Sequence, residues 1–426
     1  MMTNGKPRVV VLGGNFAGLA SAQKIREYAG DAVEITVIDR NPYLLFIPNI
    51  PGEVFENRDP AASLRMDTYK AWQEARVDFI QGEVRGINPD TRAVEFTPKE
   101  REGSAYETMT YDYLVVAFGC RLAYDRIAGF AEHGHAVSDT YYANKLRRAL
   151  FDGGYKGGPI AVGSARFHQG TAVKDLVPMA DAACEGPPVE IMMSMATWLK
   201  NHGFGGPDKI TVFTPGRLIA EDAGEEVVNA LLGIASKMGF HYRNNVGDIT
   251  EVTAEGVSFA NGEGLWAELK ILLPDWVPHA FMKGLPLCDE EGFVVTDMLM
   301  RNPKYPEVLA CGDAAAVTVP KLGAIGHQES EIVGRQIARD LGRVSAEFAG
   351  EPLKPLVYCI GDMGDKQAFY IRSNSWFGGD TQILKMGRVP YLLKMQYKDL
   401  FFRTQGKIPP WGLDAAQFLA ERLFAA

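Results

Sequence analysis

Two cysteines stand in short motifs whose residue types suit sulfur redox chemistry. Cys184 opens the segment Cys-Glu-Gly-Pro-Pro-Val-Glu, which ends at Glu190, and Cys359 opens Cys-Ile-Gly-Asp-Met-Gly-Asp. A pair of thiols can carry two electrons by opening and closing a disulfide. Taken singly, either cysteine can be explained as a small buried apolar residue, and the spacing around Cys359 alone favours that explanation. The two motifs therefore need support from the rest of the chain.

A helix is predicted directly after the first motif, over residues 189–203. A helix N-terminus favours negative charge, so this helix is expected to lower the pKa of the Cys184 thiol. From the residues alone, Glu190 fits two readings equally: part of the chemistry, or a complement to the helix dipole. Glycines after Cys359 permit close packing against a ligand, and the alternative is a strand residue before a turn.

The N-terminal segment predicts a dinucleotide site. An apolar run over residues 8–14 is typical of a buried parallel strand, and a helical stretch follows its glycines. Asn15 takes the place of the middle glycine in the G-x-G-x-x-G pattern, and a second strand ends in an acid that can bind a ribose. The candidate cofactor contacts in this segment are Gly13, Gly14, Asn15, Gly18, Asp39 and Arg40.

Two further segments favour FAD over NAD. Residues 307–313, ending in Gly312-Asp313, resemble the second FAD motif of flavoproteins with two dinucleotide-binding domains. Residues 111–119, ending in Gly119, resemble the segment where the chain of such proteins leaves the FAD domain. This resemblance implies one FAD domain built from two separate pieces of chain.

A second dinucleotide unit is predicted to lack its nucleotide. The strand at residues 158–163 is followed by Ser-Ala-Arg-Phe-His-Gln instead of further glycines, and the strand at 209–216 ends in Thr214-Pro215 without an acid. Both contacts of an NADH site are therefore missing. Binding of a 2′-phosphate by Arg166 is kept as an alternative.

Composition bounds the remaining classes. The chain has 426 residues and a net charge of −9, which disfavours a nucleic-acid binder. No apolar run reaches the about 18 residues of a membrane-spanning helix, and the polar N-terminus predicts no signal peptide. The five cysteines form neither a disulfide scaffold nor a metal site.

Together the motifs resemble those of sulfide:quinone oxidoreductases and the related flavoprotein subunit of flavocytochrome c sulfide dehydrogenase. The resemblance includes Pro320-Lys321-Leu322-Gly323 and covers nearly the whole chain. It implies that Cys184 and Cys359 form a redox disulfide or polysulfide bridge beside the flavin, and that sulfide leaves a persulfide on Cys184. It also implies that Glu190 accepts a proton and that Lys321 lies near the flavin ring.

The chain departs from this family at two places. Many members carry a third cysteine in the stretch that matches residues 136–140 here, which has no cysteine, and Cys120 lies at a different position. The chain thus resembles a two-cysteine member. The segment at Asn41-Pro42 also lacks a cysteine, so non-covalent FAD is expected. Cys288 and Cys311 are expected to pack in strands or loops.

Residues 381–426 are richer in basic and apolar residues than the rest of the chain. This pattern is typical of an amphipathic helix on a membrane surface, and equally of a helix packed on its own domain. The family resemblance favours a membrane anchor around a quinone pocket, with Phe401 and Trp411 as the quinone contacts. The basic residues are Lys385, Arg388, Lys394, Lys398, Arg403 and Lys407.

The sequence thus predicts an α/β, tandem Rossmann-like flavoprotein with a C-terminal amphipathic membrane-associating region. The expected parts are the FAD domain at 1–122 and 285–340, a second Rossmann-like domain at 123–284, and a quinone and membrane region at 341–426. We expect a monotopic sulfide:quinone oxidoreductase on a prokaryotic cytoplasmic membrane, with its membrane face and any homo-oligomer left open. Its alternatives are a type II NADH:quinone oxidoreductase and a degenerate flavoprotein that acts as a redox sensor or scaffold.

Overall fold

The N-terminal lobe is organised around a seven-stranded sheet in the order β18-β8-β1-β2-β5-β6-β7. Its first five strands in this order run parallel, and β6 and β7 are antiparallel additions. The strands are β1 (Arg8–Leu12), β2 (Glu34–Asp39), β5 (Asp78–Asn88), β6 (Ala93–Pro98), β7 (Glu107–Thr110), β8 (Tyr113–Val116) and β18 (Val308–Ala310). The strands predicted within 8–14, 111–119 and 307–313 are confirmed, and β18 joins the sheet from late in the chain.

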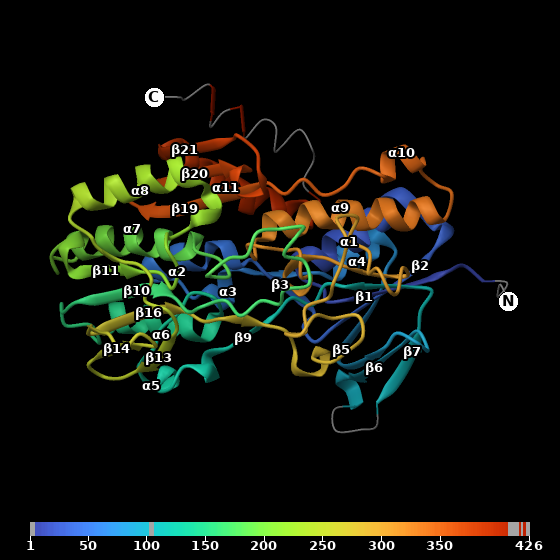
Figure 1. The fold of residues 1–426 in the computed structure, drawn as a ribbon, viewed down its shortest axis with the longest axis horizontal. Coiled ribbons are helices and arrows are strands. Elements are labelled where there is room, and N and C mark those ends of the chain that lie inside the picture. The colour runs from blue at the N-terminus through green and yellow to red at the C-terminus, as the bar shows by residue number, and fades with distance from the viewer. Residues whose placement is uncertain (1–4, 102–105, 408–416, 419–420, 423–426) are drawn as a thin grey trace.

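Two long helices pack side by side on this sheet, α1 (Phe16–Ala29) and α9 (Gly323–Asp340) (Figure 1). They can approach closely because Gly334 has no side chain. A Cβ there would lie only 2.8 Å from the backbone of Lys24. The smaller elements of the lobe are β3 (Tyr43–Leu45), α2 (Ile50–Phe55), α3 (Pro60–Ser63), β4 (Arg65–Asp67), α4 (Tyr69–Ala75) and α10 (Ala346–Ala349).

The second lobe repeats the parallel plan on a four-stranded sheet, β12-β11-β10-β16. Its strands are β10 (Ile160–Ser164), β11 (Ile210–Phe213), β12 (His241–Arg243) and β16 (Leu269–Leu273). A small sheet of β13 (Ile249–Val252), β14 (Gly256–Phe259) and β15 (Gly264–Trp266) adjoins it. Its helices are α5 (Phe130–His133), α6 (Thr140–Phe151), α7 (Gly186–Asn201) and α8 (Glu225–Met238). The chain is therefore a mixed α/β protein with Rossmann-like sheets.

The chain crosses between the lobes twice, and the two crossings pair with each other. β9 (Arg121–Leu122) leads into the second lobe and β17 (Trp276–Val277) leads back, as an antiparallel ribbon. The second lobe is thus inserted between β8 and β18, which are neighbours in one sheet.

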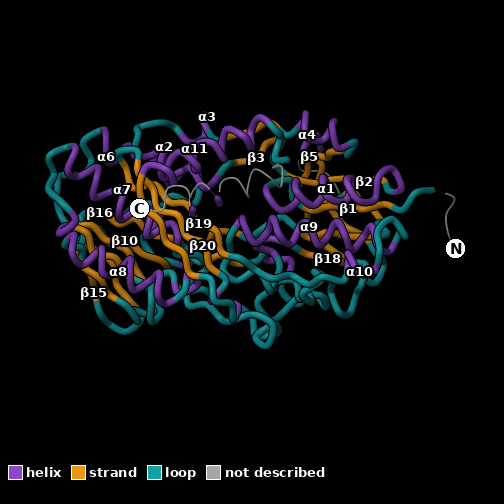
Figure 2. Tube along the Cα trace, turned by 90° about the horizontal axis from the view of Figure 1, so that it is seen from above, coloured by secondary structure: helices purple, strands orange, loops and turns teal. Residues whose placement is uncertain are grey.

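A C-terminal sheet lies over both lobes. It consists of β19 (Val357–Gly364), β20 (Gln367–Ser373) and β21 (Gln382–Gly387), followed by α11 (Arg388–Arg403). β19 contacts both α7 and α9. In Figure 2, β19 and β20 lie between α7 and α8 of the second lobe and α1 and α9 of the N-terminal lobe. The computed structural model describes residues 5–101, 106–407, 417–418 and 421–422. Within these residues, no helix has the length and apolar character needed to cross a membrane.

Candidate functional site

The two cysteines of the motifs lie together where the C-terminal sheet meets the second lobe. Cys184 is in the loop before α7, and Cys359 is in β19. A Cβ built on Gly186 would lie 2.9 Å from Cys359 Sγ, so the start of α7 faces this thiol directly. The two thiols are close enough to interact, because the negative charge of an ionised Cys359 raises the pKa of Cys184. Both cysteines are free thiols in the structure.

The pKa of each thiol is raised, and the expected lowering at Cys184 was wrong. The backbone N–H of Gly186 does donate to the Cys184 sulfur, as a helix N-terminus should. Burial of the thiol outweighs this hydrogen bond and raises its pKa well above the ordinary value. Burial likewise raises the pKa of Cys359, to about 12.

Glu190 lies beside Cys359 and forms a buried ion pair with Lys394. Its Oε1 atom accepts a hydrogen bond from the backbone N–H of Asp362 at 2.9 Å and another from the Lys394 ammonium group. Burial raises the pKa of Glu190, and the charge of Lys394 opposes this effect. The sequence placed Lys394 on a basic surface, and this was wrong: its side chain is 4% exposed because it reaches inward to Glu190.

Two further acids near Cys184 were missed from the sequence. Glu185 is buried, and its Oε2 atom accepts the backbone N–H of Ala220 at 2.8 Å. Asp222 lies in the short helix η6 (Glu221–Ala223), and its negative charge raises the pKa of both cysteines. Burial raises the pKa of Glu185 to about 8 and that of Asp222 to about 6. Glu185 directly follows Cys184, but nothing in the sequence indicates that its side chain is buried, and Asp222 lies too far along the chain to signal its proximity to either cysteine.

A small cavity opens against Cys359. It has ≈ 10 Å³ of free space, which suits one molecule about the size of water. Asp222 and Gly186 line it together with apolar side chains. These are Val189, Leu322, Val357, Phe369 and Ile371, with Ala220 and Ala223.

The glycine-rich loop between β1 and α1 fits a dinucleotide. A Cβ at Gly13 would lie 2.5 Å from the Ala117 carbonyl oxygen, and one at Gly18 would lie 1.9 Å from the Gly13 carbonyl oxygen. Asn15 Oδ1 is buried and has no hydrogen-bond partner among the described residues. A helix N-terminus with an unpaired buried acceptor suits a phosphate group and a ligand hydroxyl. The residues present thus fit the FAD that the sequence predicts.

The other predicted cofactor residues lie at the same edge of the sheet. Asp39 ends β2, where it accepts the N–H of Gly14 at 2.6 Å and that of Asn41 at 2.7 Å, and Arg40 beside it is exposed. Gly119 follows β8, and Gly312 follows β18. These strands run parallel, so their carboxyl ends bring residues from distant segments together.

A buried carboxylate holds the Gly312-Asp313 turn through a hydrogen bond. Glu329 of α9 accepts the N–H of Gly312 at 2.6 Å and the hydroxyl of Thr318 at 2.7 Å. Sequence inspection missed Glu329, because a glutamate inside an amphipathic helix is ordinarily a surface residue. Its neighbour Lys321 is also buried, donates to the Ala315 carbonyl oxygen at 2.9 Å, and lies 4.1 Å from the centre of the Phe293 ring.

The remaining three cysteines lie outside the pair. Cys120 donates through sulfur to the Asp313 carbonyl oxygen at 3.1 Å, and the Lys321 charge acts on it. Cys311 directly follows β18 and is fully buried, and Cys288 packs against the core, as expected for both.

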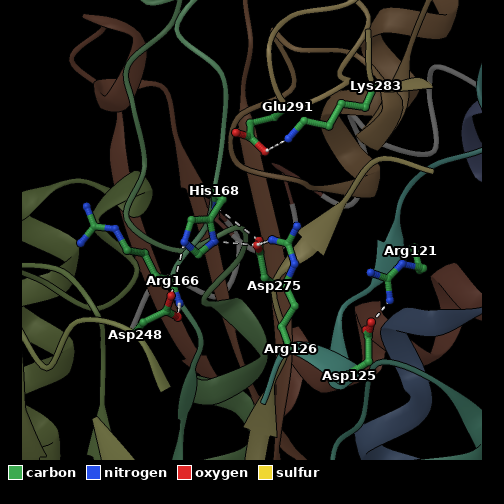
Figure 3. Close-up of polar contacts among 9 residues, drawn as sticks. All are labelled: Arg121, Asp125, Arg126, Arg166, His168, Asp248, Asp275, Lys283 and Glu291. Atoms are coloured by element: carbon green, nitrogen blue, oxygen red, sulfur yellow. Dashed lines mark hydrogen bonds and ion pairs between the residues drawn. The ribbon is translucent and has the colours of Figure 1, made fainter. Parts of the chain in front are cut away.

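Ion pairs link side chains of the loop that follows β10, and Gly163 within β10 packs against Phe213 of the neighbouring strand β11. A Cβ at Gly163 would lie 2.6 Å from the Phe213 ring. Figure 3 shows His168 between two carboxylates, 2.9 Å from Asp275 and 3.3 Å from Asp248, with Arg126 also on Asp275 at 3.1 Å. Arg166, the alternative 2′-phosphate ligand, forms an ion pair with Asp181 at 3.3 Å. The polar groups of this loop are thus engaged with one another.

Phe401 lies in a buried aromatic cluster beside the glycine-rich loop. Its side chain is 1% exposed, and its ring centre is 5.3 Å from that of Phe16 and 5.2 Å from that of Phe46. Tyr397 completes the cluster at 6.2 Å. Trp411, the second quinone candidate, lies outside the described residues.

Comparisons with known proteins agree with this architecture. Residues 7–173 match the family "Pyridine nucleotide-disulphide oxidoreductase". The chain is 22% identical over 423 residues to the sulfide-quinone reductase of Aquifex aeolicus, covering 92% of this chain and 90% of that protein. The solved structure of the sulfide:quinone oxidoreductase from Aquifex aeolicus superposes with a TM-score of 0.79 at 19% identity, over 98% of this chain and 96% of that one.

A second group of relatives has a different electron donor in its name. The type II NADH:quinone oxidoreductase of Staphylococcus aureus is also 22% identical, over 381 residues that cover 81% of this chain and 85% of that protein. The predicted resemblance to sulfide:quinone oxidoreductases is confirmed. Since identity is equal for the two groups, the choice of electron donor depends on the residues of the site.

Proposed function

We propose that this protein is an FAD-dependent sulfide:quinone oxidoreductase. The observation that carries the proposal is the meeting of Cys184 and Cys359 from distant segments, beside the buried pair of Glu190 and Lys394. FAD, when bound, supplies an acceptor for two electrons and a route for them to quinone. Gly13, Asn15, Asp39 and Asp313 would hold it, without a covalent link.

The cysteines would act as a disulfide that sulfide opens. Hydrosulfide attacks Cys184, a new sulfur–sulfur bond forms there, and the bond to Cys359 breaks. Cys184 then carries a persulfide, and Cys359 leaves as a thiolate with the electron pair. The positive charge of Lys394 lowers the pKa of Cys359 against the larger effects of burial and of Glu190, so it stabilises this thiolate.

Glu190 is proposed as a proton acceptor beside Cys359. The ammonium group of Lys394 favours its ionised form, while burial raises its pKa and so favours uptake of a proton. Lys321 is proposed to lie at the flavin, where a buried cation would stabilise negative charge.

The loop after β10 supports sulfide over NADH as the donor. The ion pairs of His168 and Arg166 lie in the loop after β10, where a pyridine nucleotide would need glycines and open backbone. The related NADH:quinone oxidoreductases make NADH the rival donor, and the experiment below includes it.

Quinone reduction is proposed at the C-terminal side of the molecule, on a membrane surface. α11 places Phe401 next to Phe16, which begins α1 directly after the glycine-rich loop. An aromatic ring at this position could meet both the cofactor and a flat quinone head. Trp411 is retained as a second contact, and binding of vesicles by the purified protein tests the membrane proposal.

The deciding experiment is an anaerobic titration of the purified protein with sulfide, followed by flavin absorbance. We expect stoichiometric sulfide to bleach the flavin, a soluble quinone to restore its colour, and NADH to leave it unchanged. Bleaching by NADH with no response to sulfide would overturn the proposal. A preparation without any flavin would favour a scaffold or sensor instead.

A further inference from the structure

The cavity against Cys359 is small and mostly apolar. Its ≈ 10 Å³ of free space is about the least that holds one water, so it excludes a bulky thiol such as a tripeptide. Hydrogen sulfide, the smallest thiol, is larger than water and enters only with a small movement of the lining side chains. Moving an anion from water into apolar surroundings costs far more free energy than moving a neutral molecule. The cavity therefore fits neutral hydrogen sulfide better than the hydrosulfide anion.

Neutral hydrogen sulfide must lose a proton before it can react. In thiol chemistry the anion is the nucleophile, and the protonated form is not. If the neutral molecule enters, a base has to lie on the wall of the cavity. Among the described residues that line it, Asp222 alone carries a carboxyl group.

The surroundings of Asp222 leave its carboxyl group available. Glu190 does not line the cavity, and its Oε1 atom already accepts hydrogen bonds from Lys394 and from the N–H of Asp362. No cation pairs with Asp222 among the described residues.

The charged and titratable groups around Asp222 are acidic. Glu221 lies on its own turn, Glu185 and Cys184 face it from the loop before α7, and Cys359 faces it from β19. β20 contributes the apolar Phe369 and Ile371 to the cavity, the neighbouring turn Ser375–Phe377 has no titratable group, and α8 begins with Glu225 and Glu226, which are exposed.

We propose that this cavity admits neutral hydrogen sulfide and that Asp222 takes its proton. The inference rests on the proposed function and adds a catalytic residue to it. The carboxylate gains one proton, and hydrogen sulfide becomes hydrosulfide. Hydrosulfide then attacks the Cys184 sulfur, which accepts a hydrogen bond from the N–H of Gly186 at the cavity wall; a sulfur–sulfur bond forms there, the bond to Cys359 breaks, and Cys359 leaves as a thiolate. The disulfide is the oxidant, so no further reagent is needed.

The proton balance of the reaction calls for two acceptors. Oxidation of hydrogen sulfide to sulfur at oxidation state zero releases two electrons and two protons. Asp222 receives the first proton inside the cavity, before the disulfide opens. The second proton is the hydrogen of the persulfide on Cys184. The Cys359 thiolate can take this proton, and Glu190 beside Cys359 can accept it in turn.

The test compares Asp222→Asn with Glu221→Gln, a neighbour on the same turn that does not line the cavity. Rapid mixing measures the rate at which sulfide bleaches the flavin. We expect Asp222→Asn to slow this reaction by about 100-fold at neutral pH, a typical effect of losing a general base. In the wild type the rate should fall as the pH drops through about 6, and this dependence on Asp222 should disappear in the variant. Glu221→Gln keeps the base, so its rate at neutral pH should match the wild type, and its fall at low pH should remain but move to a lower pH, because the charge of Glu221 raises the pKa of Asp222.

A second readout does not depend on turnover. The negative charge of Asp222 raises the pKa of both thiols, so Asp222→Asn should make the reduced cysteines react faster with uncharged iodoacetamide. If Asp222 acted only through its negative charge, its removal would speed the attack of the hydrosulfide anion. If Asp222 is the base, its removal slows the reaction with sulfide. Asp222→Ser serves as a second variant if the Asp222→Asn protein does not fold.

The two hypotheses fail separately. Wild-type protein that sulfide bleaches, with variants at Asp222 that keep its rate and pH profile, would overturn the role of Asp222 alone. Wild-type protein that sulfide does not bleach would overturn the proposed function and this inference with it.

Discussion

Lys394 of α11 donates a hydrogen bond to Glu190 of α7 across 204 positions of the chain, and both side chains are buried. This pair joins the C-terminal helix to the second lobe directly beside Cys359. A buried charge that loses its partner is costly, because neither water nor an opposite charge then compensates it. The pair therefore couples the position of α11 to the electrostatics of the thiol.

Replacement of Lys394 by methionine should destabilise the protein. The variant leaves Glu190 buried without its cation, at a cost of about 3–5 kcal/mol. Urea unfolding followed by circular dichroism measures the loss as a lower midpoint. The double variant with Glu190→Gln should recover part of it, since no lone charge remains.

Lys407→Met is the matched control for this experiment. Lys407 forms an exposed pair with Glu74 at 3.4 Å, and such pairs contribute about 0–1 kcal/mol. Equal losses in the two lysine variants would contradict the assigned importance of the buried pair.

Removal of either cysteine of the pair should nearly abolish electron transfer from sulfide to quinone. Neither Cys184→Ala nor Cys359→Ala removes a residue at the glycine-rich loop, so flavin should remain bound in both. Steady-state quinone reduction and the flavin spectrum check the two statements. Cys288→Ala is the control, and Cys120→Ala should have a much smaller effect. Full activity in either variant of the pair would rule out the relay.

Stability should depend on pH through Glu329. Burial raises its pKa from 4.5 to about 7, so the native protein holds a proton that the unfolded chain releases. The free energy of unfolding therefore falls as the pH rises through this interval, by on the order of 3 kcal/mol from this group. Glu329→Gln removes the titration, and Thr318 can rotate its hydroxyl to suit the amide. Urea midpoints across the interval should be flatter in the variant, and parallel profiles would contradict the prediction.

Phe401 should affect both stability and quinone. Phe401→Ala leaves a hole among Phe16, Phe46 and Tyr397, and such a change in a core costs about 3–5 kcal/mol. The milder Phe401→Leu keeps apolar volume but removes the ring. We expect it to raise the KM for a soluble quinone several-fold while sulfide reduces the flavin at the wild-type rate. An unchanged quinone KM in Phe401→Leu would argue against stacking.

Local pattern predicted the strands and glycine turns well. The run that became β1, the turn at Gly13 and the acid at Asp39 are read directly from residue order, since strand, turn and acid are close in sequence. The helix α7 was also predicted, although it begins at Gly186, earlier than expected. The domain boundaries and the roles of the site residues stay predictions.

Distant contacts could not be read from the chain. Nothing around Asp222 or Glu329 in the sequence indicates burial, because each acid lies in a polar or amphipathic setting. Lys394 looked like one of several surface cations until α11 was seen to direct it towards Glu190. The sign of the thiol pKa was also missed, since burial depends on how β19 covers the start of α7.

The position of Cys359 in the C-terminal sheet has a consequence for the making of the protein. Synthesis proceeds from the N-terminus, so Cys184 leaves the ribosome long before its counterpart. All strands of the two Rossmann-like sheets precede β19 in the chain. A nascent chain can thus complete its nucleotide fold while its thiols are still apart. The proposed reaction of the two thiols would become possible only at the last stage of maturation, when β19 docks on α7.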